Sequence, residues 1–67
     1  MDKQTAIKTA HRHADVALDG GFVADGRENL IDTLNDDGYA DFVADALQAY
    51  DDAVALSYKA RDRANIY

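Results

Sequence analysis

Cysteine, proline and tryptophan are all missing from this 67-residue chain, and glycine occurs only four times. Without cysteine there are no disulfides and no thiolate metal sites, which many small domains use to compensate for a small core. A chain of this length buries only about 60% of the surface that its unfolded form exposes, so a deep catalytic cleft is not expected. The sequence therefore predicts one helical domain over residues 1–67 that depends on regular packing or on self-association.

Long apolar runs are also missing, because charged residues are scattered through the first 20 positions. A signal peptide and a transmembrane helix both need an uninterrupted apolar segment, so neither fits this N-terminus. We expect a soluble, cytoplasmic protein with no membrane partner.

Basic residues are few, with seven against thirteen acidic ones, which gives a formal net charge of −6 and a pI near 4.4. The imbalance is concentrated between residues 15 and 52, where eleven acids are accompanied by Arg27 alone, a net charge of −10. The segments on either side carry +2 each. Such acidity disfavours binding to duplex DNA, because phosphate contacts require cations. It favours a cationic partner, or none.

Apolar residues at helical spacing divide the chain into three predicted helices. The first covers residues 2–19 and is ended by Gly20 and Gly21, one of which is expected in the left-handed cap conformation. The third covers residues 39–65 and spans nearly 40 Å at ~1.5 Å per residue. We therefore predict an all-α fold, a small three-helix domain in which the long C-terminal helix is the spine for the two shorter ones.

The second predicted helix is short and covers residues 25–36. Asp25 and Glu28 have the spacing of a capping box, in which each side chain satisfies a free backbone amide at the start of the helix. Phe22 and Val23 precede this helix as a short apolar linker, which we expect to pack onto the core.

The turn sequence NDDG, residues 35–38, invites comparison with a calcium-binding EF-hand loop. With the glycine at loop position 6, Thr33 occupies position 1 and Ala44 occupies position 12, where acidic ligands are required. The calcium interpretation therefore fails. Helix capping explains the turn better, with Asp36 or Asp37 expected to cap the third helix.

Two histidines, His11 and His13, are close in sequence, but on a helix they point 200° apart. His11 and Asp15 do share a face, yet no further histidine exists to complete a zinc site. His11 as a general base also lacks a nucleophile, because Ser57 is on a different helix in an unremarkable context. We predict no catalytic residue, no metal site, no cofactor and no enzymatic activity.

Carboxylates carry the most pronounced functional signal. On the third helix the aspartates fall opposite the apolar face, and on the second helix acids recur every four residues. Like charges at that spacing mildly destabilise a helix. A row of acids without interspersed lysine therefore lowers stability, and the fold itself does not require it. The predicted acidic surface consists of Glu28, Asp32, Asp36, Asp37, Asp41, Asp45 and Asp52.

Two interpretations of the acidic surface stay open. In the first, its carboxylates imitate rows of phosphates and bind a basic, nucleic-acid-handling protein, which the chain regulates or inhibits as a DNA mimic. Small size, acidity and the lack of a catalytic constellation resemble, at the level of class only, phage- or plasmid-encoded inhibitors of host defence. In the second, a high-salt or acid-biased proteome has placed aspartate on a surface that is merely solvated.

Two further hypotheses use other parts of the chain. The apolar face of the third helix, where the shorter helices leave it uncovered, is a candidate surface for a homodimer or for a structural or accessory subunit. The C-terminal end is a candidate for weak nucleic-acid binding through phosphate contacts and stacking. A structural explanation is also open, because cations near the C-terminal end of a helix are stabilised by the negative end of its macrodipole. That basic and aromatic cluster consists of Tyr58, Lys59, Arg61 and Arg63.

Overall fold

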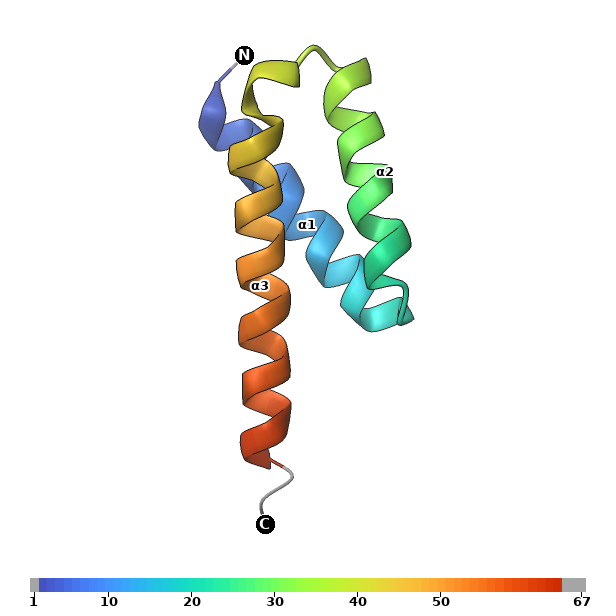
Figure 1. Ribbon diagram of the computed structural model, residues 1–67, viewed down its shortest axis with the longest axis vertical. Helices are drawn as coiled ribbons and strands as arrows, with labels where there is room; N and C mark the ends of the chain where they lie inside the picture. The colour runs from blue at the N-terminus through green and yellow to red at the C-terminus, as the bar shows by residue number, and fades with distance from the viewer. Residues whose placement is uncertain (1, 65–67) are drawn as a thin grey trace.

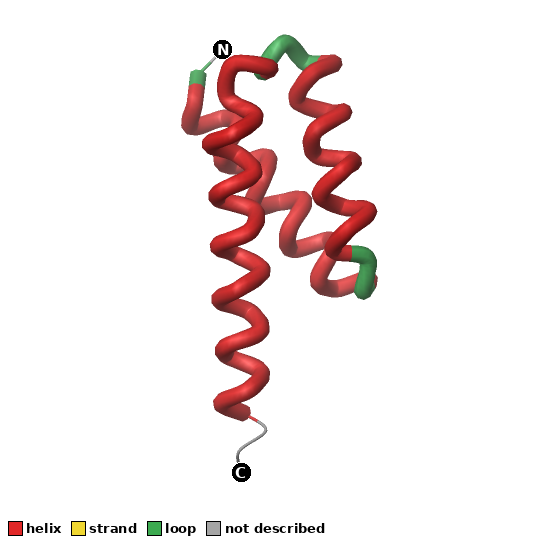
Figure 2. The backbone as a smooth tube through the Cα atoms, in the orientation of Figure 1, coloured by secondary structure: helices red, strands yellow, loops and turns green. Residues whose placement is uncertain are grey.

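The computed structural model describes the backbone of residues 2–64 and the side chains of residues 2–58. Over that range the chain forms α1 (Lys3–Gly20), α2 (Val23–Asp36), a short 3-10 helix η1 (Ala40–Phe42) and α3 (Val43–Ala64). In Figure 1, α2 and α3 run in opposite directions and α1 crosses obliquely behind them. The tube view shows that short turns make the connections between the helices (Figure 2). The prediction of an all-α, three-helix fold with a long C-terminal helix is confirmed.

Local signals set both ends of α1, and the predicted left-handed glycine cap at its C-terminal end is confirmed. The side chain of Asp2 is the N-cap and accepts a hydrogen bond of 2.8 Å from the backbone amide of Thr5. Gly21 ends the helix with φ at 74°, a left-handed conformation that glycine adopts without a steric penalty. The amide of Phe22 then donates to the carbonyl of Ala17 at 3.0 Å, which satisfies a carbonyl that the end of the helix leaves free.

The predicted start of α2 is wrong. The helix begins at Val23 with Phe22 in the N-cap position, and neither a side-chain cap bond nor the proposed capping box forms there. Asp25 lies in the first turn instead, because the amide of Gly26 already donates to the carbonyl of Phe22 at 2.8 Å. Phe22 is 39% exposed and so does not pack into the core as a linker residue, whereas Val23 does pack against it.

The turn between α2 and η1 also differs from the prediction, because neither aspartate caps the following helix. Asp36 is the last residue of α2 and Asp37 is its C-cap, while Tyr39 precedes η1 without a side-chain cap bond. Gly38 has φ at 82°, and the amide of Tyr39 donates to the carbonyl of Leu34 at 2.7 Å. These are the features of a Schellman motif, which ends α2 through backbone bonds alone.

The core is narrow, and α1 contributes only alanines to it. Small side chains at these positions let α2 and α3 approach α1 closely, and Tyr50, Leu30 and Leu34 are the largest fully buried side chains. The predicted apolar face of the third helix is confirmed through residue 54, since its members are buried or packed against the buried cluster. Over residues 2–58 the buried residues are Ala6, Ala10, Ala14, Ala17, Gly26, Leu30, Leu34, Ala46 and Tyr50.

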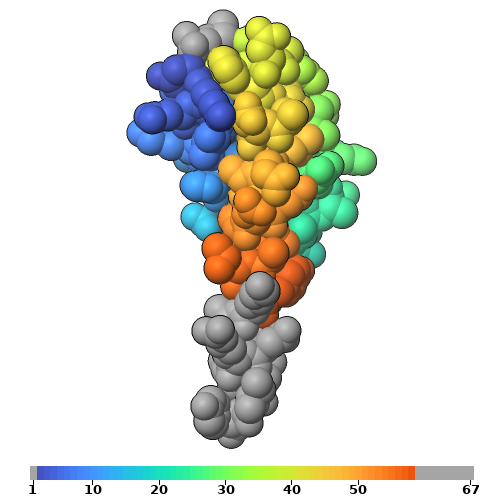
Figure 3. Space-filling view, turned by 60° about the vertical axis from the view of Figure 1, so that its left-hand side comes forward, coloured from blue at the N-terminus to red at the C-terminus, as the bar shows by residue number. Residues whose placement is uncertain are grey.

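The molecule is elongated, with Cα extents of 45 × 19 × 14 Å. Figure 1 shows the cause, because the C-terminal part of α3 continues past the turn between α1 and α2. The space-filling view narrows in the same direction along α3 (Figure 3). Across the described residues, no helix has both the length and the apolar character needed to cross a bilayer.

Candidate interaction surface

Every carboxylate whose side chain the structure describes is exposed, twelve in all. The sequence-based expectation that the acids point away from the core therefore holds for all seven residues of the acidic surface. Two ion pairs link these carboxylates to basic side chains within residues 2–58. Most of the acidic charge is thus solvated and free of a basic neighbour in this part of the chain.

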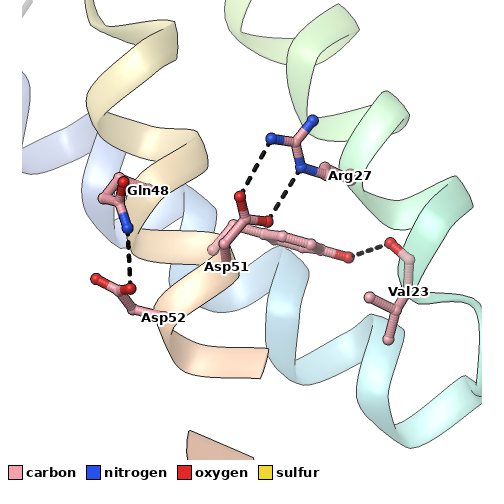
Figure 4. A network of polar contacts seen from close by, with 6 residues as sticks. Val23, Arg27, Gln48, Asp51 and Asp52 are labelled. Carbon is pink, nitrogen blue, oxygen red and sulfur yellow. Dashed lines mark hydrogen bonds and ion pairs between the residues drawn. The ribbon is translucent and has the colours of Figure 1, made fainter. Parts of the chain in front are cut away.

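Two members of the acidic surface have local partners on α3 or across to α1. Asp45 lies in the first turn of α3, where the positive end of the helix dipole favours an acid, and its carboxylate is 3.9 Å from the Nζ of Lys3. Asp52 accepts a hydrogen bond of 3.0 Å from the side chain of Gln48 (Figure 4). These contacts give Asp45 and Asp52 a structural role that helical spacing alone did not indicate.

A two-point ion pair joins α2 to α3, and the sequence analysis did not predict it. Arg27 donates from Nε to one carboxylate oxygen of Asp51 at 3.0 Å and from Nη2 to the other at 3.1 Å (Figure 4). The hydrogen bonds that Arg27 donates to Asp51 raise the pKa of its guanidinium, and the negative charge of Asp51 adds to the effect. The sequence feature that could have indicated this pair is the position of Arg27, which is the single cation among eleven acids between residues 15 and 52.

The remaining five members form what we call the outer acidic row. Three lie at four-residue spacing along α2, on the side away from its buried Leu30 and Leu34, and two continue through the turn into η1. Within residues 2–58 none of the five forms an ion pair. The outer acidic row consists of Glu28, Asp32, Asp36, Asp37 and Asp41.

The structure thus separates the predicted acidic surface into two parts. Asp45 and Asp52 lie on the edge of α3 that adjoins α1, as the contact to Lys3 and a groove shared with α1 indicate. The outer acidic row follows α2 and the turn after it. The ion pair between Arg27 and Asp51 lies at the junction of α2 and α3.

The predicted C-terminal cluster lies largely outside the described side chains. Tyr58 is 49% exposed on α3. Lys59, Arg61 and Arg63 are on the helical backbone of α3, but their side chains are not among those described.

Two shallow grooves border α1. The groove between α1 and α2 has a volume of about 330 Å³ and is lined by Arg12, His13, Val16, Phe22, Gly26 and Asn29. The groove between α1 and α3 has a volume of about 470 Å³ and is lined by His11, Asp15, Ala49, Asp52, Ala53 and Leu56. Both are open at the surface.

Neither histidine belongs to a group of metal-binding side chains in the described part of the chain. His13 directs Nδ1 toward the carbonyl oxygen of Thr9 at 2.9 Å, so this nitrogen carries the proton and donates to the backbone. His11 shares its groove with Asp15 and Asp52. No set of three His, Asp or Glu side chains among residues 2–58 is arranged to hold a metal ion.

Comparison of the chain with protein-family models, with curated proteins and with solved structures finds no significant match.

Proposed function

We propose that this chain is a non-enzymatic interaction protein whose acidic surface binds a basic, nucleic-acid-handling protein and thereby regulates or inhibits it. The observation that carries the proposal is the outer acidic row, five exposed carboxylates without an ion pair among the described residues. Such a row creates a negative potential that steers a basic partner toward it.

The position of Asp36 and Asp37 supports a role beyond folding. The C-terminal end of a helix carries partial negative charge, so acids there are unfavourable and cations are favoured. Asp36 is the last residue of α2 and Asp37 is its C-cap, and the last turn has no basic residue. Asp32 adds a further like charge four residues before Asp36. The fold therefore tolerates repulsion here that an amide or a lysine would relieve.

The outer acidic row is also held on a rigid support. Leu30 and Leu34 anchor α2 in the core, and the two-point contact of Arg27 with Asp51 adds an exposed link between α2 and α3. A fixed array of charges loses little conformational entropy when a partner binds, so more of its attraction appears as affinity. Along α2 the carboxylates recur at a rise of ~6 Å per four residues.

The test uses two variants that lose the same charge at the same helical spacing. Asp32→Asn with Asp36→Asn removes two carboxylates of the outer acidic row, and Asp15→Asn with Asp19→Asn removes two from α1. Each protein and the native chain are immobilised and exposed to lysate of the native host. The proposal predicts that native protein and the α1 variant retain the same basic protein, while the outer-row variant loses it.

Two further conditions show whether the captured protein binds as proposed. Duplex DNA added as a competitor releases it if the acidic row occupies its nucleic-acid site. Salt at ~1 M releases it as well, because screening then acts within about 3 Å. Equal recovery by the outer-row variant, or retention that is unchanged at ~1 M salt, would contradict the proposal.

A further inference from the structure

The groove between α1 and α2 combines exposed apolar side chains with a cation. Val16 is 57% exposed and Phe22 is 39% exposed, and both line the groove beside the short turn that joins the two helices (Figure 1). The six described residues of the lining include Arg12 but no acid. Small-molecule sites are typically built in this way, from apolar and aromatic walls with a few polar groups that fix orientation. The volume of about 330 Å³ lies at the lower end of the range for such sites.

Two glycines make room for the ring of Phe22, which is one wall of the groove. A Cβ atom at Gly20 would overlap this ring, and a Cβ atom at Gly26 would lie 3.8 Å from its Cδ2 atom. The ring therefore lies against the end of α1 and the first turns of α2 while it stays partly exposed. An apolar wall that is already in place costs little reorganisation when a ligand binds.

Polar side chains border the same groove. His13 donates its Nδ1 proton to the carbonyl of Thr9 at 2.9 Å, which orients the imidazole ring. Asn29 supplies an amide that both donates and accepts hydrogen bonds. Arg12 is exposed and forms no ion pair with a carboxylate among residues 2–58. Its guanidinium is therefore available for two-point donation, and the acceptor that matches this geometry is a carboxylate.

The length of the groove limits what can occupy it. The lining runs from residue 12 to residue 16 on α1 and from residue 22 to residue 29 on α2, about 6 Å and 10 Å at ~1.5 Å per residue. A docked helix would need anchor positions over two or more turns, so the groove suits a compact ligand. The groove between α1 and α3 is lined by Asp15 and Asp52 instead, and these two charges repel an anion.

We propose that the groove between α1 and α2 binds a small carboxylate with a compact aromatic body, of the size of an arylacetate. The carboxylate pairs with Arg12, and the aromatic ring lies against Phe22 and Val16. Because the groove is open on one side, the expected dissociation constant is about 1 mM. None of the seven residues of the acidic surface lines this groove, so the inference is independent of the proposed function.

Titration of the purified chain with phenylacetate, followed by the chemical shifts of its backbone amides, tests the inference. The expected shifts saturate and lie at residues 12–16 and 22–29. The titration is made in ~0.15 M salt, where the Debye length of about 8 Å screens the more distant acids. Phenylacetamide has the same ring without the charge, and it should bind about three- to fivefold more weakly, the range that an exposed ion pair contributes.

Matched variants test the contacts. Arg12→Gln should raise the dissociation constant of phenylacetate about three- to fivefold and affect phenylacetamide much less. Lys8→Gln is the control, because it removes the same charge one turn earlier on α1 and Lys8 does not line the groove. Gly20→Ala displaces the ring of Phe22 and should weaken the binding of both ligands. Circular dichroism establishes that the variants keep their helices.

Three outcomes would overturn the proposal. The first is a titration that shows no saturation up to about 20 mM phenylacetate, or shifts confined to the groove between α1 and α3. The second is equal binding of phenylacetate and phenylacetamide. The third is equal weakening by Lys8→Gln and Arg12→Gln, because general attraction to positive charge would then explain the binding without a contact to Arg12.

Discussion

The hydroxyl of Tyr50 donates a hydrogen bond of 2.6 Å to the backbone carbonyl of Val23, which joins the middle of α3 to the first turn of α2. Tyr50 is the largest fully buried side chain, and it reaches this carbonyl because Gly26 has no side chain. A Cβ atom at position 26 would lie 2.7 Å from the hydroxyl oxygen of Tyr50 and 2.7 Å from the Cβ of Ala17. Gly26 is therefore a packing residue at the place where all three helices meet.

Gly26→Ala is expected to destabilise the fold although alanine is the better helix former. The gain in helix propensity is about 1 kcal/mol, whereas overpacking a close contact costs about 1–3 kcal/mol. We expect a net loss of about 1 kcal/mol, and at most about 2 kcal/mol, in the free energy of unfolding, measured by urea denaturation. Gly20→Ala is the control, because its Cβ would meet only the ring of Phe22, which is partly exposed and can turn away. Equal stability of the Gly26→Ala variant and the native chain would show that α1 and α3 can move apart at no cost.

Tyr50→Phe is expected to lower the free energy of unfolding by about 1 kcal/mol at neutral pH, the typical net value of one hydrogen bond. The loss should shrink at alkaline pH. Burial raises the pKa of the Tyr50 phenol above its ordinary value of 10.0, and the charge of Asp51 adds to the increase. The folded state thus holds the phenol proton more tightly than the unfolded state does. Its stabilisation is complete below about pH 10 and falls as the pH rises through the folded pKa.

Urea denaturation between pH 8 and the alkaline limit of reversible folding measures this difference. The curves of the native chain and of Tyr50→Phe should converge above about pH 10. Tyr58→Phe serves as the control, because Tyr58 is 49% exposed and this substitution removes a phenol without touching the core. A gap between native and Tyr50→Phe that stays constant with pH would show that the phenol is not held protonated by the fold.

The sequence was sufficient to predict three helices, but not where α2 and α3 begin, since α3 starts at Val43 after η1 and not at residue 39. Helical spacing identified the buried side of each helix, and glycine marked the ends of α1 and α2 at Gly21 and Gly38. The Asp25–Glu28 spacing was misleading, because it is typical of a capping box and placed the start of the helix next to Gly26, a residue of low helix propensity. The contact with Tyr50 outweighs that propensity, and a contact 24 residues away in sequence leaves no local signal.

The candidate interaction surface was predicted in part for the same reason. Exposure of the carboxylates follows from their place opposite the apolar residues of each helix, which a single helix specifies. The pairs Lys3 with Asp45 and Arg27 with Asp51 depend on how helices pack. The division of the acidic surface into a partnered part on α3 and the outer acidic row therefore required the tertiary structure.

Asp2 gives the start of α1 a dependence on acid pH. Hydrogen bonding to Thr5, through its side chain first and its backbone amide second, lowers the pKa of the Asp2 carboxyl below its ordinary value of 3.8. A lowered pKa in the folded state means that the stabilisation is present above the unfolded pKa and is lost as the pH falls through the folded one.

The measurement compares the helicity of the native chain with that of Asp2→Ala by circular dichroism between pH 7 and pH 2. The native chain should be more helical at pH 7, and the two should converge below pH 3.8. A difference that persists at pH 2 would mean that the charged cap is not the cause.

Asp36 and Asp45 provide a matched test of whether the outer acidic row is retained at a cost to stability. Asp36 ends α2, where the helix dipole and Asp32 both disfavour negative charge, whereas Asp45 begins α3 and lies near Lys3. Asp36→Asn should therefore raise the free energy of unfolding by a few tenths of a kcal/mol, and Asp45→Asn should lower it by a similar amount. Thermal denaturation at low salt measures both, and the two effects should fade toward ~1 M salt because exposed charges are screened. If Asp36→Asn destabilises the chain as Asp45→Asn does, the carboxylate at position 36 contributes to folding. The case for a binding role of the outer acidic row would then lose its main support.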